Sequence, residues 1–328
     1  MELRTLDLFC GGGGSSWGAK NAGGDMVCAV DSWGLAAETF RDTFPTANVV
    51  EQELKPRTNR RILGDTGPFD LIIASPECTN HTCARGSRER CEKSRATARH
   101  VLNFARAFQP RWIVIENVIQ MRSWAGYADL LKELRRNYRV TEQILDAADF
   151  GVPQNRRRLF LICDREEEPR DLTRVTRAEP GAVRDILDPA GTWKRGALFT
   201  DRRAEGTLER ARRGIEALGE GVPFLVVYYG SDGAGGWQPL DRPIRTLTTL
   251  DRFGLVEWDT GEPTLRMLQV PELKKAMGFD PEYQLRFGSR RERIKLLGNG
   301  VCPPVMEGIV NSLCFRDRDE LPMMQAAE

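Results

Sequence analysis

The first half of the chain alternates short apolar runs with stretches of helical periodicity, and this alternation constrains the fold more than any other feature. Strands are predicted at residues 6–9, 26–30, 71–74, 112–116, 140–144 and 159–163. Helices are predicted between them at residues 16–22, 35–44, 95–108 and 127–137. Strands alternating with helices are typical of βαβ units. We therefore predict an α/β fold with a doubly wound, mostly parallel sheet, whose ligands bind beyond the carboxyl ends of the strands.

The character of the sequence changes after residue 163. Residues 164–222 are highly charged and weakly periodic, and a strand-like piece at 224–229 precedes a glycine-rich stretch, GSDGAGGWQP. Near residue 295 the chain reads as a turn, LLGNGVCPP, followed by a helix at 305–313 that can return to the first part. We predict a catalytic domain formed by residues 1–164 and 295–320, and a second, smaller domain at 165–294.

Composition limits the class of protein. The 328 residues are 41% hydrophobic and 29% charged, which is ordinary for a soluble globular protein. No apolar run approaches the roughly 20 residues that span a bilayer, and the first residues lack the apolar core of a signal peptide. We therefore predict a cytoplasmic protein without a membrane partner, whose eight scattered cysteines are reduced thiols. The net charge of +1 does not discriminate for or against nucleic acid.

A glycine-rich loop follows the first predicted strand in DLFCGGGGSS and opens a helix. Glycines at this point let the backbone approach a ligand closely and leave helix N–H groups free. The next strand, MVCAVDS, ends in Asp31, which in this fold can accept hydrogen bonds from ribose hydroxyls. Asp31 can also be explained as the N-cap of the helix at 35–44. The two features together favour an adenosine-type cofactor.

Reactive side chains follow three later strands. Cys78 lies two residues after Pro76 in SPECTNHTC, where an α/β enzyme carries its chemistry. Glu116 ends the apolar strand WIVIE, and partial burial of that carboxyl should raise its pKa and suit it to donate a proton. In PQNRRRLFLI, three polar side chains share one strand face and form a polar wall for an anion or a base edge, unless they simply solvate an edge strand: Gln154, Arg156 and Arg158.

Several segments, in this order, resemble motifs of the cytosine-C5 DNA methyltransferase family. They are DLFCGGGG, SPEC, ENV at 116–118, QNRRR at 154–158, RPIRTLTTLDRFGLV, RMLQVPELKKAMGFDPEYQL and GNGVCPPV. The resemblance covers nearly the whole chain except about 165–222. It implies a Rossmann-like methyltransferase fold with a smaller target-recognition domain. It also implies a DNA (cytosine-5-)-methyltransferase activity that uses S-adenosyl-L-methionine. Such an enzyme would belong to a restriction-modification system or be encoded by a phage.

The resemblance also implies roles for single residues. The Cys78 thiolate would attack C6 of a cytosine flipped out of double-stranded DNA, and neighbouring arginines would lower its pKa. Glu116 would contact N3, Arg158 would hold O2, and Gln154 and Arg156 would support the active-site loop and strand. The S-adenosylmethionine site would be lined by Phe9, Gly11, Gly13, Asp31, Pro76 and Asn299, with Glu53 as the acid for the adenine amine. We expect a monomer without a metal ion.

Two residues beside the nucleophile depart from the family pattern. Thr79 stands where glutamine is usual, and His81 stands where an aromatic residue is usual. Since this loop helps to fill the space left by the flipped base, the departures bear on how the base is delivered. The segment before RTLTT, roughly 165–240, is short, and we predict a short or modestly specific DNA target.

Three alternatives stay open. The same scaffold can act on a transfer RNA cytosine, or it can transfer a modified group from a related sulfonium donor. A non-enzymatic alternative is a zinc-stabilised nucleic-acid binding module, drawn from Cys78, His81, Cys83 and Cys91. The spacing of these four residues is not that of a familiar structural zinc site.

Overall fold

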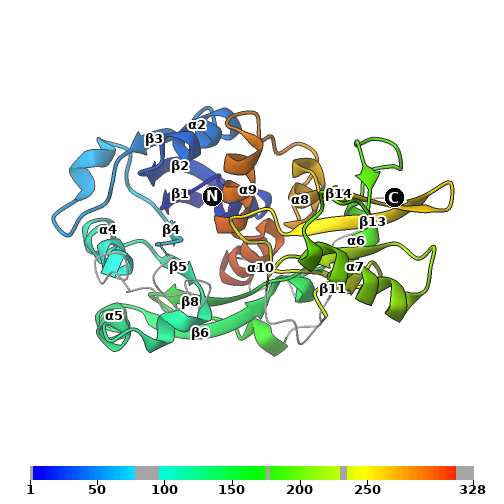
Figure 1. Cartoon of the computed structure of the whole chain (residues 1–328). Helices are drawn as coiled ribbons and strands as arrows, with labels where there is room; N and C mark the ends of the chain where they lie inside the picture. The colour runs from blue at the N-terminus through cyan, green and yellow to red at the C-terminus, as the bar shows by residue number, and fades with distance from the viewer. Residues whose placement is uncertain (1–2, 78–95, 175–177, 230–234, 315–328) are drawn as a thin grey trace.

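The computed structural model describes residues 3–77, 96–174, 178–229 and 235–314, and they form a larger part and a smaller part (Figure 1). In the larger part, seven strands form a sheet in the order β3-β2-β1-β4-β5-β8-β6. Neighbouring strands from β3 to β5 are parallel, and β8 is antiparallel to both β5 and β6. The bounds are β1 Leu3–Leu8, β2 Gly24–Asp31, β3 Asn48–Glu51, β4 Leu71–Ala74, β5 Trp112–Asn117, β6 Arg139–Asp146 and β8 Arg157–Asp164. The predicted α/β fold with a mostly parallel sheet is confirmed.

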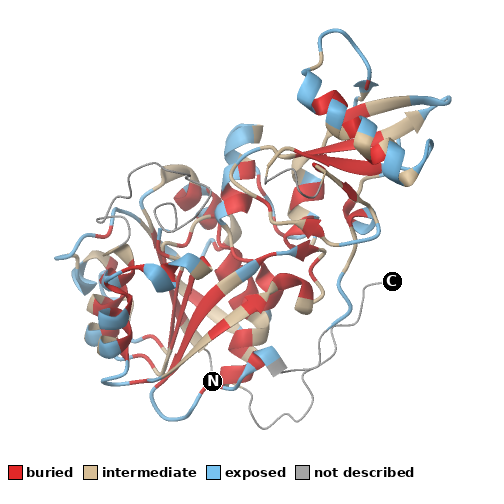
Figure 2. Cartoon of the chain, turned by 60° about the horizontal axis from the view of Figure 1, so that its bottom comes forward, coloured by how far each residue is buried: buried red, intermediate tan, exposed pale blue. Residues whose placement is uncertain are grey.

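Helices cover both faces of this sheet. Because side chains alternate along a strand, Leu6 and Leu8 of β1 join the core on one face, while Leu71 and Ile73 of β4 join the core on the other. The first core is covered by α4 (Val101–Phe108) and α5 (Tyr127–Leu134). The second is covered by α1 (Gly14–Asn21), α2 (Gly34–Thr43) and α10 (Pro303–Cys314). Figure 2 shows the sheet as the most buried part of the chain.

The first and last described helices approach each other at two glycines. A Cβ added to Gly14 would lie 2.4 Å from the carbonyl oxygen of Val301, and one added to Gly18 would lie 2.2 Å from that of Pro303. Real Cβ atoms do not come so close to backbone oxygens, so α10 can pack on α1 only because both positions are glycine. This contact brings the GNG turn of residues 298–300 back to the large sheet.

The smaller part is built on a five-stranded sheet in the order β11-β10-β13-β14-β9. One face packs against α7 (Glu205–Leu218), where Phe224 and Val226 meet Ala211. On the other face Leu225 and Val227 enter the core that the larger sheet also uses. The strands are β9 Gly196–Ala197, β10 Phe224–Val227, β11 Trp237–Pro239, β13 Phe253–Asp259 and β14 Glu262–Met267.

Short elements connect the two parts. A two-stranded parallel pair joins β7 (Gln154–Asn155) to β12 (Ile244–Arg245). Residues 165–294, predicted as the smaller domain, contain the five-stranded sheet and also α8, whose Leu273 and Ala276 lie in the core of the larger part. The other elements are α6 Val183–Ile186, α8 Val270–Ala276, α9 Arg290–Asn299 and the 3-10 turns Arg60–Leu63, Ala96–His100, Ile119–Ser123, Ala147–Asp149 and Leu172–Arg174.

The structure differs from the sequence predictions at several places, and strand β3 is one that was not predicted. Helix α7 lies inside the segment described as weakly periodic. The described part of the helix predicted at 95–108 begins as a 3-10 turn at Ala96 and becomes α-helical only at Val101, and the helix predicted to reach residue 137 ends at Leu134. Residues 154–158 do not form one strand, because β7 and β8 are separated at Arg156. No helix in the described ranges has the length and apolar character needed to cross a membrane.

Candidate active site

The glycine-rich loop follows β1 at the carboxyl edge of the sheet. Three of its residues have left-handed backbone: Phe9 at φ 60°, Gly11 at 52° and Gly13 at 84°. This conformation costs little at glycine, but it is strained at Phe9, and such strain concentrates at functional sites. Gly13 is the N-cap of α1, so the loop delivers the chain into that helix.

Asp31 ends the neighbouring strand β2 and binds the glycine-rich loop. Its Oδ2 accepts a hydrogen bond from the N–H of Gly11 at 2.8 Å, and its Oδ1 accepts one from the N–H of Trp33 at 2.8 Å. Burial raises the pKa of Asp31, and the backbone donors lower it. The N-cap of α2 is Trp33 rather than Asp31. Each carboxylate oxygen keeps a lone pair for a further donor, so the structure brings Gly11 and Asp31 together in a form that can bind a diol.

The segment after β4 leads to the predicted nucleophile. Pro76 is buried, and its carbonyl oxygen accepts a hydrogen bond from Nδ2 of Asn117 at 3.1 Å. Asn117 follows Glu116, and its Oδ1 accepts from the N–H of Val118 at 2.8 Å. The ends of β4 and β5 are therefore tied together. The predicted nucleophile Cys78 and the neighbouring Thr79 lie outside the described residues. The other three members of the zinc alternative also lie outside them: His81, Cys83 and Cys91.

The buried Glu116 forms an ion pair with the partly buried Arg158 at the end of β5. The distance from Nε of Arg158 to Oε1 of Glu116 is 3.2 Å, and Glu116 is 6% exposed. Burial raises the pKa of Glu116, while the guanidiniums of Arg158 and Arg156 lower it. The net direction is upward, as the strand-end position predicted. An acid of this kind can hold or give a proton beside a cation that attracts a carbonyl oxygen.

Gln154 and Arg156 bind main-chain groups from distant segments. Gln154 donates to the carbonyl oxygen of Ala276 at 3.0 Å and accepts from the N–H of Leu247 at 2.8 Å. Arg156 donates to three carbonyl oxygens at 2.8–2.9 Å, those of Leu247, Gly298 and Gly300. The predicted polar wall is therefore divided: Arg158 faces Glu116, whereas Gln154 and Arg156 hold the backbone around the site.

Asn299 is exposed at the last position of α9. The residue before it fixes the turn, because a Cβ on Gly298 would lie 2.2 Å from the carbonyl oxygen of Thr248. Among the described residues, Asp31 bonds to the backbone of Gly11 and Trp33, and no hydrogen bond joins Asn299 to Asp31 or to the glycine-rich loop. The structure therefore locates Asn299 on a rigid turn without bringing it against the other cofactor residues.

Glu53 lies beyond the third strand, which ends at Glu51. Its side chain is 70% exposed and lies 3.5 Å from Nζ of Lys55. Glu51, which sequence reasoning missed, is paired in register with Asp31 across β2 and β3. The register of the two strands, which only the structure gives, identifies Glu51 as the acid at the same edge as Asp31.

A second residue missed by sequence reasoning is Asp7, the last but one residue of β1. It is fully buried, and its Oδ2 accepts a hydrogen bond from Oγ of Ser16 at 2.6 Å. Its Oδ1 has no hydrogen-bond partner within the described chain. Burial raises the pKa of Asp7 to about 8, although the bond from Ser16 lowers it. Asp7 thus ties β1 to α1 beneath the glycine-rich loop.

Replacing Asp7 by asparagine should flatten the dependence of stability on pH. The folded protein holds the Asp7 proton up to about pH 8, whereas the unfolded chain loses it near 3.8. Between these values the folded state binds more protons, so the free energy of unfolding of the wild type falls with rising pH, by at most about 1.4 kcal/mol per unit. An asparagine side chain cannot ionise. In urea unfolding, the free energy of unfolding of Asp7→Asn should therefore rise relative to that of the wild type as the pH is raised from 5 to 9. Parallel pH profiles would contradict this account.

These features define an α/β enzyme whose site lies at the carboxyl ends of parallel strands. The chain belongs to the C-5 cytosine-specific DNA methylase family, whose family model matches residues 3–314. It is 31% identical over 308 residues to the Type II methyltransferase M.HgiDI of Herpetosiphon aurantiacus. This alignment covers 91% of this chain and 90% of that protein.

Solved structures share the fold at low sequence identity. The S. pombe Dnmt2 methyltransferase superposes with a TM-score of 0.69 at 18% identity, over 98% of this chain and 100% of that chain. The Entamoeba histolytica methyltransferase EhMeth gives a TM-score of 0.68 at 16% identity, over 98% and 100%. The fold of the chain therefore occurs in methyltransferases of known structure.

Proposed function

We propose that this enzyme transfers a methyl group from S-adenosyl-L-methionine to C5 of a cytosine flipped out of double-stranded DNA. The observation that carries the proposal is the ion pair between the buried Glu116 and Arg158, with 3.2 Å between Nε and Oε1, at the sheet edge to which Pro76 also belongs. Membership of the cytosine-specific family supports the substrate, and it favours double-stranded DNA over transfer RNA.

The chain's own residues suit the cofactor. Asp31 has carboxylate lone pairs available beside the Gly11 amide, which matches the two hydroxyls of a ribose. Phe9, Gly11, Gly13, Pro76 and Asn299 would complete the site, and Glu51 replaces Glu53 as our candidate for the adenine amine because it lies opposite Asp31. When bound, S-adenosylmethionine supplies an electrophilic methyl group.

The protein residues would act on the cytosine ring. The Cys78 thiolate adds to C6, while Glu116 holds a proton at N3 and Arg158 attracts O2, so that the electrons of the ring move toward C5. After C5 has gained the methyl group, a base removes the C5 proton and the thiolate leaves C6. The aromatic ring and the free Cys78 are thereby restored. Gln154 and Arg156 keep the strands and the GNG turn in place during this cycle.

We infer that residues 165–294 read the DNA and that residues 1–164 and 295–320 carry the chemistry. The five-stranded sheet with α7 is small, which supports a short target sequence. The names of the curated relatives favour a role in restriction-modification.

The experiment is methyl transfer by the purified full chain from labelled S-adenosylmethionine to duplex DNA, single-stranded DNA and transfer RNA, with mass spectrometry of the nucleosides. We expect 5-methylcytosine in duplex DNA. Label found only in transfer RNA would contradict the proposal and support the transfer RNA alternative. A cytosine adduct other than 5-methylcytosine would show that the donor is a modified sulfonium compound. Stoichiometric zinc in a protein without transfer activity would favour the binding module.

A further inference from the structure

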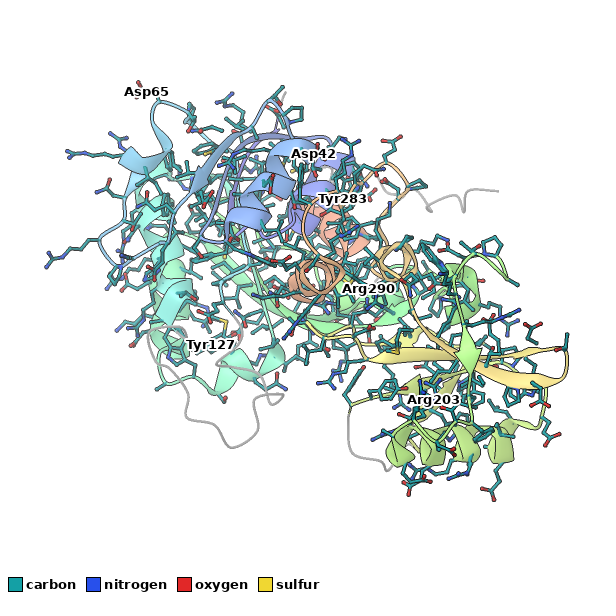
Figure 3. All side chains as sticks on the ribbon, turned by 45° about the horizontal axis from the view of Figure 1, so that its top comes forward. Asp42, Asp65, Tyr127, Arg203, Tyr283 and Arg290 are labelled. Atoms are coloured by element: carbon teal, nitrogen blue, oxygen red, sulfur yellow. The ribbon has the colours of Figure 1, made fainter. Side chains whose placement is uncertain are left out.

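We propose that Tyr283 is a positioning residue that fixes the glycine-rich loop of residues 9–13 and thereby sets the affinity for S-adenosylmethionine. The inference rests on the proposed function but concerns a residue 271 positions away from the loop it holds. Tyr283 lies in the segment between α8 and α9, and Figure 3 labels it within the larger part of the molecule.

The contact between Tyr283 and the loop is direct. The phenol O–H donates a hydrogen bond to the carbonyl oxygen of Gly12, and Tyr283 is 1% exposed. A Cβ on Gly12 would lie 3.0 Å from the same phenol oxygen. Position 12 must therefore stay small for the bond to form, even though its own φ is not one of the left-handed angles of the loop. Burial raises the pKa of Tyr283, so the phenol keeps its proton and remains a donor.

The ring of Tyr283 is held on several sides. It stacks on Phe279 with 4.0 Å between ring centroids and meets the edge of Trp17 at 5.4 Å. The indole N–H of Trp17 donates to Oδ2 of Asp280 at 2.7 Å, and Nζ of Lys274 donates to the carbonyl oxygen of Tyr283 at 2.7 Å. The phenol oxygen consequently has little freedom to follow the loop if the loop moves.

The loop needs such support because its own hydrogen bonds are few and its backbone is strained. Among the described residues, the main-chain hydrogen bonds of the loop run from Cys10 to Val30 at 3.1 Å, from Gly13 to Cys10 at 2.9 Å and from Trp17 to Gly13 at 2.8 Å. Strained residues such as Phe9 persist only where surrounding contacts determine their conformation. Asp31 holds the loop from the ligand side through Gly11, and Tyr283 holds it from the core side through Gly12.

The test compares two conservative variants that each remove one buried phenol oxygen. Tyr283→Phe removes the donor to Gly12. Tyr138→Phe is the matched control, because that phenol is 8% exposed and donates to the carbonyl oxygen of Pro110 at 2.9 Å, away from the loop. A third variant, Trp17→Phe, removes the bond to Asp280 that steadies the segment and keeps an aromatic ring in place.

Calorimetric titration of the full-length proteins with S-adenosylmethionine gives the readout. We expect Tyr283→Phe to raise the dissociation constant about tenfold, the effect of losing one buried hydrogen bond, with faster hydrogen exchange in a peptide covering the loop. Trp17→Phe should raise it less, Tyr138→Phe should leave it unchanged, and the Michaelis constant for DNA should stay the same in all three.

Three results would overturn the inference. Wild-type affinity in Tyr283→Phe would refute it while leaving the proposed function intact. An equal loss of affinity in Tyr283→Phe and Tyr138→Phe would mean that the loss comes from general destabilisation of the protein and not from the contact with Gly12. A wild-type protein that does not bind S-adenosylmethionine would remove the proposed function and this inference together.

Discussion

Glu116→Gln is expected to lower the rate constant of methyl transfer by about 10²–10⁴-fold, the usual contribution of a positioned acid. Glutamine keeps the shape of the side chain at the end of β5 but cannot hold an ionisable proton. Because burial raises the pKa of Glu116, the protonated form persists to higher pH than an ordinary glutamate allows. The wild-type rate should therefore fall as this carboxyl ionises with rising pH, and the variant should lack that alkaline fall.

The measurement is single-turnover methyl transfer across pH, with calorimetric binding of S-adenosylmethionine as a second readout. Binding should be unchanged, since Asp31, the candidate for the ribose, bonds to the backbone of Gly11 and Trp33, whereas Glu116 pairs with Arg158. Glu133→Gln is the control, because that glutamate pairs at the surface with Arg106 at 2.8 Å. A wild-type rate in Glu116→Gln would mean that another group supplies the proton at N3.

Arg156→Met is expected to destabilise the fold by about 3–5 kcal/mol, because it leaves three carbonyl groups without their charged donor. Arg156 is 3% exposed and binds the carbonyl oxygens of Leu247, Gly298 and Gly300 at 2.8–2.9 Å. These acceptors belong to the loop before β13 and to the GNG segment at the end of α9. Losing the guanidinium should therefore loosen the junction between the two parts as well as the turn that carries Asn299.

Three consecutive arginines allow a matched comparison by urea unfolding. Arg157→Met should change the free energy of unfolding little, because Arg157 is exposed. Arg158→Met should impair methyl transfer strongly, since that guanidinium lies beside Glu116. An equal loss of stability in the variants at 156 and 157 would contradict the role given to Arg156.

The central strands of the large sheet could be predicted from sequence because β4 and β5 are nearly continuous apolar runs, as expected for strands buried on both faces, whereas the short and largely exposed β3 was not predicted. The segment 71–74 agrees with β4, and the other predicted strands differ from the structure by a few residues at their ends. Helix α7 was missed because only a narrow stripe of it is apolar, at Leu208, Ala211 and Ile215, among many charged residues. Strands of two or three residues, such as β9, carry no detectable period.

The site was predictable only where local sequence determines position. Glu116 ends an apolar strand, and that alone indicated a buried acid. Glu51 required the register between β2 and β3, and Tyr283 required a contact across 271 positions, neither of which a one-dimensional pattern contains. Arg156 and Arg158 are identical residues two positions apart, and only their tertiary partners distinguish a structural guanidinium from one beside the reacting acid.

The central claim is that the chain methylates cytosine in DNA through Cys78. Bisulfite sequencing of DNA from a host that expresses the wild type, beside one that expresses Cys78→Ser at the same level, tests it most directly. We predict protected cytosines at a short recurring target sequence in the wild-type sample and none in the Cys78→Ser sample. Protected cytosines in both samples would contradict the nucleophile, and none in either would contradict the activity.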